Sequence, residues 1–228
     1  MISVIIPTLH AAGRLKLVLA ALGPGALEGH VKELIVSDGG SGDDTEAIAD
    51  IAGARVVTGE CGRGSQLARG AAAARGDWLL FLHADTVLKE GWVEEARELM
   101  KDRSRAGVFT LAFDARGAAP RLVAFGAMLR TRLFYAPYGD QGLLISRATY
   151  DEIGGFAPLP LFEDVDILSR LIRVKGRRAL CVMKSKAVTS ADRYERDGYL
   201  NRVLKNAWCL MLYRFGVAPS RIADIYAR

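Results

Sequence analysis

The chain is poor in cysteine and has no long apolar run, and each absence excludes a class of protein. Three cysteines are present, at widely spaced positions: Cys61, Cys181 and Cys209. Their spacing and odd number exclude a disulfide framework and a cysteine zinc site, and they indicate a reduced, cytoplasmic protein. The longest apolar run, residues 207–213, is far shorter than the ~20 residues that span a bilayer. Residues 1–10 contain no basic leader, so we expect a first strand there and not a signal peptide.

A glycine-rich dinucleotide fingerprint is also missing. No G-x-G-x-x-G opens the first expected helix, which argues against a dehydrogenase. The arginines do not form a stripe with interleaved aromatic residues, which make up 8% of the chain, so we expect no binding of nucleic acid. The net charge of +5 at pH 7 suits anionic partners, because the planar guanidinium pairs bidentately with phosphate. A soluble surface with excess arginine is the alternative explanation.

The first half of the chain alternates short apolar runs with amphipathic segments. We expect strands at 3–7, 33–37, 54–58 and 78–83. The intervening helices are expected at 14–22, 44–52, 65–74 and 91–100. Continuous apolar strands separated by helices predict an α/β fold with a parallel sheet that is covered on both faces. In such sheets, ligands bind beyond the carboxyl ends of the strands.

The second half is less regular but contains the same kinds of segment. Strands are expected at 106–114, 142–146, 177–183 and 186–191, and helices at 120–135, 163–176 and 198–215. No repeat or linker divides the chain, which predicts one compact α/β unit. The helices at 120–135 and 198–215 are apolar with arginine or lysine flanks. Peripheral contact with an anionic membrane and ordinary core packing are therefore both open for these two helices.

Polar groups directly follow the expected fourth strand, in the segment "LLFLHADT" (79–86). His83 and Asp85 lie two residues apart, so their side chains would share one face of a continuing strand. An imidazole with a carboxylate suits Mn²⁺, whereas Mg²⁺ prefers oxygen ligands alone. Two protein ligands would suffice for an ion that a diphosphate also holds. The alternative is a hydrogen-bonded histidine and a helix-capping aspartate.

Two glycine-rich loops follow the second and third expected strands. In "SDGGSGDDT" (37–45), Asp38 can accept hydrogen bonds from a ribose or a base N–H, although a solvated turn would have the same composition. In "GECGRGSQLARG" (59–70), a turn around Arg63 opens a helix that carries Arg69. A helix N-terminus of this kind favours an anion.

Three acids crowd the start of the helix expected at 163–176: Glu163, Asp164 and Asp166. They would complement the helix dipole, which is the simplest explanation. Alternatively, mutual repulsion and partial burial raise the pKa of one of them, so that it can accept a proton.

Two further segments carry polar residues that could contact a ligand. Asp140 and Gln141 form a polar patch in the glycine-flanked loop "YGDQG". Arg193 and Arg196 lie three residues apart in "SADRYERDG". The two arginines would either clamp phosphates or form a solvated pair.

The order of four segments resembles a known family. "SVIIPTLH", "ELIVSDGGSGDDT", "ARGDWLLFLHADT" and "FEDVDILSRL" together resemble the family 2 glycosyltransferases, over roughly residues 2–175. The resemblance implies the GT-A nucleotide-diphospho-sugar transferase fold, a mainly parallel twisted sheet flanked by helices. "HAD", "GDQ" and "S-x-x-R-aromatic-E" also resemble a compact subgroup associated with arsenosugar biosynthesis. A single domain over 1–228 would then have a nucleotide-binding half, 1–105, and an acceptor-binding half, 106–228.

The resemblance further implies an inverting, hexosyltransferase-type enzyme. Its donor would be a nucleotide-diphospho-sugar, with uridine diphosphate expected and guanosine diphosphate as the alternative, and its cofactor Mn²⁺ or Mg²⁺. The implied nucleotide-binding residues are Pro7, Thr8, Asp38, Arg63, Gln66, Arg69 and Ala84. The implied metal ligands are Asp85 and His83, the general base is Asp164, and the acceptor or diphosphate contacts are Asp140, Gln141, Glu163, Arg193 and Arg196.

Two departures from the family pattern affect these roles. His83 replaces the first acid of the family's D-x-D motif, which leaves the identity of the metal open. Gly39 replaces a second acid after Asp38, which weakens the assignment of ribose contacts. The whole interpretation requires that Asp85 and Asp164, some eighty positions apart, line one cleft.

Two other functions remain as alternatives. A nucleotidyltransferase would carry a glycine-rich, basic loop after its first strand, but this position reads "PTLHAAGR". A catalytically silent nucleotide-sugar-binding protein would be expected to have lost Asp85 or Asp164, and both are present.

Overall fold

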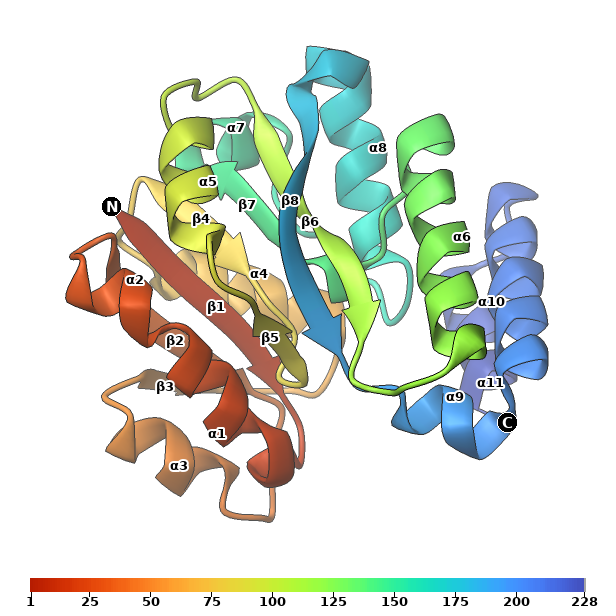
Figure 1. Cartoon of the computed structure of the whole chain (residues 1–228), viewed down its shortest axis with the longest axis horizontal. Helices are drawn as coiled ribbons and strands as arrows, with labels where there is room; N and C mark the ends of the chain where they lie inside the picture. Colours follow the sequence, from red (N-terminus) through yellow and green to blue (C-terminus); the bar gives the residue numbers. More distant parts are fainter. Residues whose placement is uncertain (228) are drawn as a thin grey trace.

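The computed structural model describes residues 1–227, and one eight-stranded sheet runs through them (Figure 1). The strands are β1 (Ile2–Thr8), β2 (Val31–Asp38), β3 (Arg55–Thr58), β4 (Trp78–Phe81), β5 (Thr86–Leu88), β6 (Ala106–Phe113), β7 (Leu143–Ser146) and β8 (Leu180–Thr189). Their order in the sheet is β3-β2-β1-β4-β7-β6-β8-β5. Strands β3, β2, β1 and β4 are parallel, and so is the pair β6 and β8. The expected mainly parallel α/β sheet is therefore confirmed.

The sheet is mixed in its second half, which the sequence did not indicate. β7 is antiparallel to both of its neighbours, β4 and β6, and β5 is antiparallel to β8. The flanking α-helices are α1 (Ala12–Ala21), α2 (Gly23–Leu27), α3 (Thr45–Ile51), α4 (Arg63–Ala73), α5 (Trp92–Leu99), α6 (Ala118–Phe134), α7 (Arg147–Glu152), α8 (Glu163–Lys175), α9 (Asp192–Asp197), α10 (Tyr199–Arg214) and α11 (Pro219–Ala227). Two short 3₁₀ helices are η1 (Gly139–Gln141) and η2 (Arg177–Ala179).

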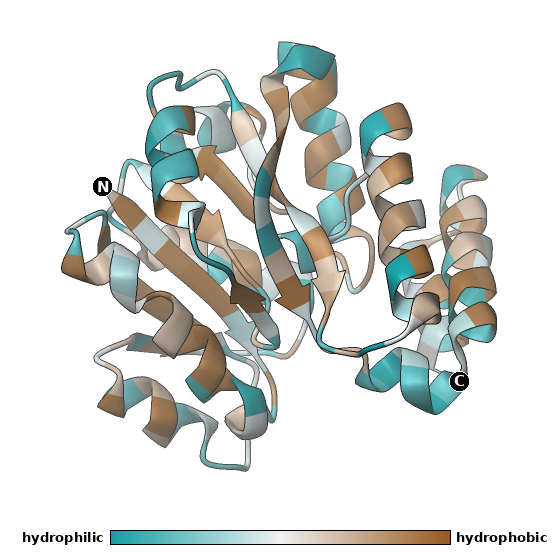
Figure 2. Cartoon of the chain, in the orientation of Figure 1, coloured by the Kyte–Doolittle hydropathy of each residue, from teal (hydrophilic) through white to brown (hydrophobic). Residues whose placement is uncertain are grey.

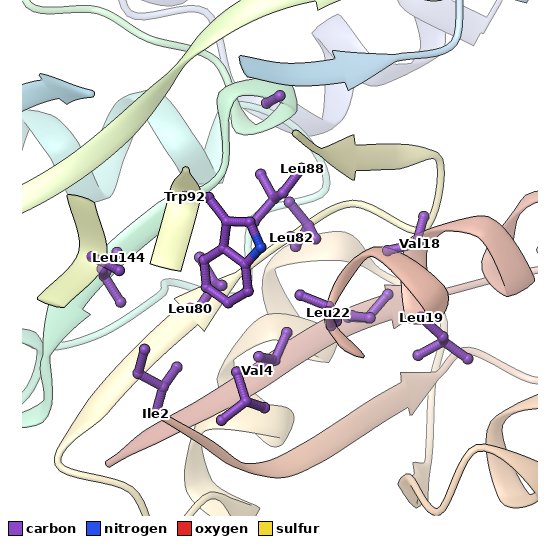
Figure 3. Close-up of a cluster of buried hydrophobic side chains, with 14 of the residues drawn as sticks. Ile2, Val4, Val18, Leu19, Leu22, Leu80, Leu82, Leu88, Trp92 and Leu144 are labelled. Atoms are coloured by element: carbon purple, nitrogen blue, oxygen red, sulfur yellow. The ribbon is translucent and has the colours of Figure 1, made fainter. Parts of the chain in front are cut away.

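Apolar side chains form a cluster on each face of the sheet, and Figure 2 shows that its central strands consist largely of hydrophobic residues. Side chains alternate along β1, so that Ile2, Val4 and Ile6 face one apolar cluster and Ile5 faces the other. Trp92 of α5 lies at the centre of the first cluster (Figure 3). The second cluster lies between the sheet and helices α4, α7 and α8. Because both faces are covered, the central strands read as continuous apolar runs.

The prediction of two separate strands at 177–183 and 186–191 is wrong. They form the single strand β8, preceded by η2, and its pairing with β6 shifts register after Val108. Glu95 of α5 accepts hydrogen bonds from the backbone N–H groups of Lys184 (3.0 Å) and Ser185 (2.8 Å). The register shift leaves these two N–H groups without partners in the sheet, and the Glu95 carboxylate accepts their hydrogen bonds. The strand therefore continues through the polar residues Lys184 and Ser185 without a turn.

The C-terminal helices pack on the start of α8. Phe162, Val165, Cys209 and Ile222 form a small third apolar cluster there. Helices α2, α7, α9 and α11 and strand β5 were not expected. Apart from α11, each spans only three to six residues, which is too short for a clear apolar pattern. Within the described part of the chain, none of the helices is long and apolar enough to cross a membrane.

Candidate active site

Two neighbouring cavities lie beyond the carboxyl ends of β1 and β4. The β1 cavity, of about 510 Å³, is lined by Pro7 and Thr8, by Gln66 of α4 and by Ala84. The α8 cavity, of about 120 Å³, is lined by acids of η1 and α8 and by side chains from α9, α10 and α11. The β1 cavity therefore lies at the ends of the strands, and the C-terminal helices enclose the α8 cavity.

The two cavities share a wall. Four residues line both of them: Arg63, His83, Asp85 and Arg193. The wall therefore combines two candidate metal ligands with two guanidinium groups. Asp164 lines the α8 cavity together with Asp85, which is the convergence that the interpretation of the sequence requires.

The turn that carries His83 and Asp85 differs from the expectation. β4 ends at Phe81, and the N–H of Thr86 donates to the carbonyl of His83 at 3.2 Å. The two residues lie on a turn between β4 and β5, so the prediction that they share a face of one strand is wrong. The turn nevertheless brings both side chains to the common wall of the cavities.

The protonation state of His83 suits metal binding. Burial lowers the pKa of His83 well below its usual value, and the nearby charges of Arg63 and Arg193 lower it further. The imidazole is therefore neutral at pH 7 and keeps a lone pair for a cation. Asp85 Oδ1 has only long contacts with protein hydroxyls, 3.4 Å to Thr86 and 3.5 Å to Thr189.

A metal ion at this wall would depend on a ligand for part of its coordination. Among residues 1–227, no group of three His, Cys, Asp or Glu side chains is placed to hold a metal ion. The pair His83 and Asp85 fits an ion that is shared with diphosphate oxygens, and it does not fit a closed structural site.

Helix α8 begins at an unusual backbone position. Phe162, which precedes it, has a φ of 66°, a left-handed conformation that is strained for a bulky residue. Its ring is buried and stacks on Tyr213 of α10, with 4.8 Å between the ring centroids. This packing supports the turn that directs Glu163 and Asp164 toward the α8 cavity.

The two acids at the start of α8 differ in their environment. Glu163 is 2% exposed, and its Oε1 lies 3.7 Å from Nε of Arg63. Asp164 is partly exposed and accepts hydrogen bonds from the N–H groups of Gly139 (2.5 Å) and Val165 (2.7 Å). Because Glu163 is enclosed and paired, Asp164 is the better-placed acceptor for a proton from a ligand.

Burial raises the pKa of both acids. Burial and the charge of Asp164 raise the pKa of Glu163 to about 7, against the opposing charge of Arg63. Burial likewise raises the pKa of Asp164, against the hydrogen bond from Gly139 and the charge of Arg63. The cluster therefore contains carboxyl groups that exchange protons nearer to neutral pH than isolated carboxyls do.

Gly139 lies between the side chains of His83 and Asp164. A Cβ atom on Gly139 would lie 2.6 Å from Nε2 of His83 and 3.4 Å from Oδ2 of Asp164. Any larger residue would push the His83 ring away, so glycine lets η1 pass between the two side chains.

Asp140, the next residue of η1, has an unsatisfied oxygen. Within the described residues, the buried Oδ1 atom of Asp140 has no hydrogen-bond partner. Burial raises the pKa of Asp140 to about 6, against the opposing charge of Arg130. An unpartnered buried carboxylate oxygen is costly, and this one lies in the wall of the α8 cavity, where a group that enters the cavity could donate a hydrogen bond to it.

Asp38 is buried and already saturated with protein donors. Its carboxylate accepts from Thr8 Oγ1 (2.7 Å), from Ser41 Oγ (2.6 Å) and from the N–H groups of Gly40 (2.7 Å) and Ser41 (2.6 Å). Burial alone would raise the pKa of Asp38, but these hydrogen bonds outweigh it and hold the pKa below its usual value. The carboxylate fixes the loop after β2, and a nucleoside contact would have to replace one of these bonds.

Gln66 and Arg69 of α4 brace the same edge of the sheet. Gln66 Nε2 donates to the carbonyls of Thr8 (2.7 Å) and Ser37 (2.9 Å), and Arg69 donates to the carbonyl of Asp38 (2.7 Å). Both side chains hold the strand ends in place, while only Gln66 lines the β1 cavity.

Two of the predicted acceptor or diphosphate contacts line neither cavity, and the same holds for the predicted nucleotide-binding residues Asp38 and Arg69. Gln141 is buried between β6 and α6, where its amide bonds the carbonyl of Phe109 (3.0 Å) and the hydroxyl of Thr131 (2.8 Å). Arg196 is 72% exposed and pairs with Asp197 at 2.8 Å. Neither lines the cavities described above, whereas Arg193 lines both.

Several residues of the α8 cavity were missed in the sequence. They come from η1 and the C-terminal helices: Tyr138, Tyr194, Arg202, Asn206 and Tyr226. Arg202 is 4% exposed, donates to Asp197 at 3.2 Å and lies over the ring of Tyr226. The available signal was an arginine within a largely apolar helical segment, since arginine in such a position usually has a specific partner.

The fold and the site together define the class of protein. A mainly parallel sheet with two cavities at its strand ends is the architecture of GT-A glycosyltransferases, which are the structural neighbours of this chain. The chain belongs to glycosyl transferase family 2, whose profile matches residues 3–156. This match ends before α8, so the role of Asp164 depends on the geometry of the site.

The similar proteins include one enzyme repeatedly. Glucosyl-3-phosphoglycerate synthase from Mycolicibacterium paratuberculosis is 41% identical over an alignment that covers 38% of this chain and 29% of the relative. The crystal structure of the Mycobacterium tuberculosis enzyme with phosphoglyceric acid is 25% identical, with a TM-score of 0.69, and covers 95% of this chain and 80% of that one. Its complex with Mn²⁺, UDP-glucose and phosphoglyceric acid is 26% identical, with a TM-score of 0.64, over 81% and 69%.

The chain thus aligns with about 29% of the length of the curated relatives. The expected family and fold are confirmed. The arsenosugar subgroup and the division of the chain at residue 105 stay predictions.

Proposed function

We propose that the chain transfers a hexosyl group from a UDP-sugar to an acceptor hydroxyl, with inversion at the anomeric carbon. The main support for this proposal is the wall that the two cavities share, which is formed by Arg63, His83, Asp85 and Arg193. A donor whose diphosphate lies at this wall would extend its nucleoside into one cavity and its sugar toward the other. The M. tuberculosis relative binds Mn²⁺ with UDP-glucose, and Mg²⁺ with UDP, which supports this class of donor and cofactor.

The donor side is the β1 cavity. Pro7, Thr8 and Ala84 line it and would contact the nucleoside, while Arg63 and Arg193 would pair with the diphosphate. Asp85 and His83 would hold Mn²⁺ or Mg²⁺. Such an ion stabilises negative charge on the departing diphosphate, and the two guanidinium groups would act on the same charge.

The acceptor side is the α8 cavity. Asp164 would remove the proton of the acceptor hydroxyl as that oxygen bonds to the anomeric carbon and the bond to the diphosphate breaks. The proton remains on Asp164 and the electron pair leaves with the nucleoside diphosphate. A single displacement of this kind inverts the anomeric carbon. The raised pKa of Asp164 favours its role as a base, because a carboxyl that ionises nearer to neutral pH holds a proton better.

Asp140 would recognise the acceptor. Its buried Oδ1 atom lacks a partner within the described residues and would accept a hydrogen bond from a second hydroxyl of the acceptor. Relatives bind phosphoglyceric acid or glycerol 3-phosphate, which are small hydroxyl compounds. A small polyhydroxylated acceptor is consistent with a cavity of about 120 Å³. Cytoplasmic localisation is part of the proposal, supported by three free cysteines.

Release of UDP from UDP-glucose tests the proposal. In the presence of Mn²⁺ we expect slow hydrolysis that glycerol 3-phosphate or another hydroxyl acceptor accelerates, and we expect EDTA to suppress it. Tight binding of UDP-glucose without any turnover would support the silent binding protein instead. Release of pyrophosphate from a nucleoside triphosphate and a sugar phosphate would support a nucleotidyltransferase.

A further inference from the structure

Helices α6 and α10 leave a large apolar surface uncovered. They carry eleven of the eighteen large apolar side chains that are exposed in residues 1–227. On α6 these are Leu122, Phe125, Leu129, Leu133 and Phe134, and on α10 and its C-cap they are Leu200, Val203, Leu204, Trp208, Met211 and Phe215. We call these eleven residues the α6–α10 surface.

The exposed residues follow the helical repeat on each helix. Positions 122, 125, 129 and 133 are spaced by three or four residues, and so are 200, 204, 208, 211 and 215. Each set therefore forms a stripe along one side of its helix. The opposite side of α6, with Met128 and Thr131, is buried toward β6 and η1. The two helices pack beside each other at one end of the molecule (Figure 1), and Figure 2 shows apolar residues along both.

The charged residues of the two helices all have the same sign. Within the spans of α6 and α10 they are Arg121, Arg130, Arg132, Arg202, Lys205 and Arg214, and no acid occurs in either span. Large apolar side chains that gather on neighbouring helices in this way commonly mark a surface that binds a partner or a membrane. Apolar stripes with only basic charges are complementary to a bilayer that contains anionic lipids. A second copy of this chain would bring basic helices opposite basic helices, which opposes self-association.

We propose that the α6–α10 surface docks on an anionic lipid bilayer. The apolar stripes would enter the boundary between headgroups and acyl chains, and the exposed basic side chains Arg121, Arg132 and Arg214 would pair with lipid phosphates and carboxylates. α10 also lines the α8 cavity with Arg202, Asn206 and Cys209. A docked bilayer would therefore lie about one helix diameter, roughly 10 Å, from that cavity. The proposal does not depend on the enzymatic function.

Sedimentation of the purified chain with vesicles tests the proposal. We expect the chain to sediment with vesicles of phosphatidylserine and phosphatidylcholine in equal parts, to stay in solution with phosphatidylcholine alone, and to be released as salt is raised. The double variant Phe125→Glu with Trp208→Glu should lose this binding. Ile51→Glu, on α3, is the matched control and should keep it, because Ile51 is also an exposed apolar residue, at 87%, outside the surface.

A second variant, without the three exposed arginines, tests how much charge contributes to vesicle binding. Replacing Arg121, Arg132 and Arg214 with serine keeps the apolar stripes and should weaken binding to the anionic vesicles by about fivefold for each residue. Circular dichroism checks that each variant is folded. Failure of the unmodified chain to bind anionic vesicles would overturn the proposal. It would also be overturned if the unmodified chain eluted as a dimer that Phe125→Glu with Trp208→Glu converts to a monomer.

Discussion

Replacing Asp164 with asparagine should lower turnover of a UDP-sugar by about 10²–10⁴-fold, while the affinity for the donor stays nearly unchanged. Asparagine keeps the size of the side chain and one oxygen acceptor for the N–H groups of Gly139 or Val165, but it cannot take a proton. The loss should therefore fall on kcat, because the donor contacts that we propose lie on the other side of the shared wall, in the β1 cavity.

The pH profile provides a second readout for the same variant. Burial raises the pKa of Asp164, and a protonated carboxyl cannot act as a base. The activity of the unmodified chain should consequently rise with pH through that raised pKa, and Asp164→Asn should lack this rise. Asp166→Asn is a matched control on the same helical turn, since Asp166 pairs with Arg170 at 2.5 Å and lines neither cavity. Unchanged turnover in Asp164→Asn would remove the assignment of the base.

Replacing Asp85 with alanine should weaken the Mn²⁺-dependent binding of UDP by at least about 100-fold, since even the loss of a hydrogen-bond partner of a metal ligand costs about 10–100-fold in metal affinity. Asp85 is the one carboxylate on the wall that both cavities share, and His83 alone would retain the ion poorly. Binding of UDP without a metal should change little, because in our proposal the two arginines and the β1 cavity would supply those contacts.

Calorimetric titration of UDP with and without Mn²⁺ measures this effect. Asp192→Asn is a suitable control, because Asp192 also lines the β1 cavity but forms an ion pair with Arg14 at 2.8 Å. If Asp85→Ala retained the full Mn²⁺ enhancement, the ion would be held elsewhere and the role of the "HAD" segment would have to be abandoned.

The sequence predicted the first half of the fold well, for a physical reason. Continuous apolar strands such as β1 and β4 can be stable only when both faces are covered, and this requirement leads to a parallel sheet with helices on both sides. The direction of β7 could not be predicted, because a four-residue apolar strand fits a parallel or an antiparallel position equally well. The continuity of β8 depends on Glu95, ninety residues earlier in the chain, and no local pattern reveals such a contact.

The site was predicted in part for a similar reason. Residues at the ends of neighbouring strands converge wherever the sheet is parallel, so the position of Asp85 near Thr8 follows from the strand pattern. Gln141 was assigned from its place in the "GDQ" motif and Arg196 from its spacing to Arg193, but their polar contacts turn both away from the cavities. The enclosure of the α8 cavity by α10 and α11 depends on tertiary packing around Phe162, which a helix pattern does not disclose.

The location of a bound manganese ion tests the central claim most directly. Crystals of the chain with UDP and Mn²⁺ would show the ion by its anomalous scattering. We expect a single peak within coordination distance of the Asp85 carboxylate, with UDP in the β1 cavity and Asp164 facing the open side of the diphosphate across the α8 cavity. An ion that avoids Asp85, or UDP bound at a surface that Asp164 cannot reach, would contradict it.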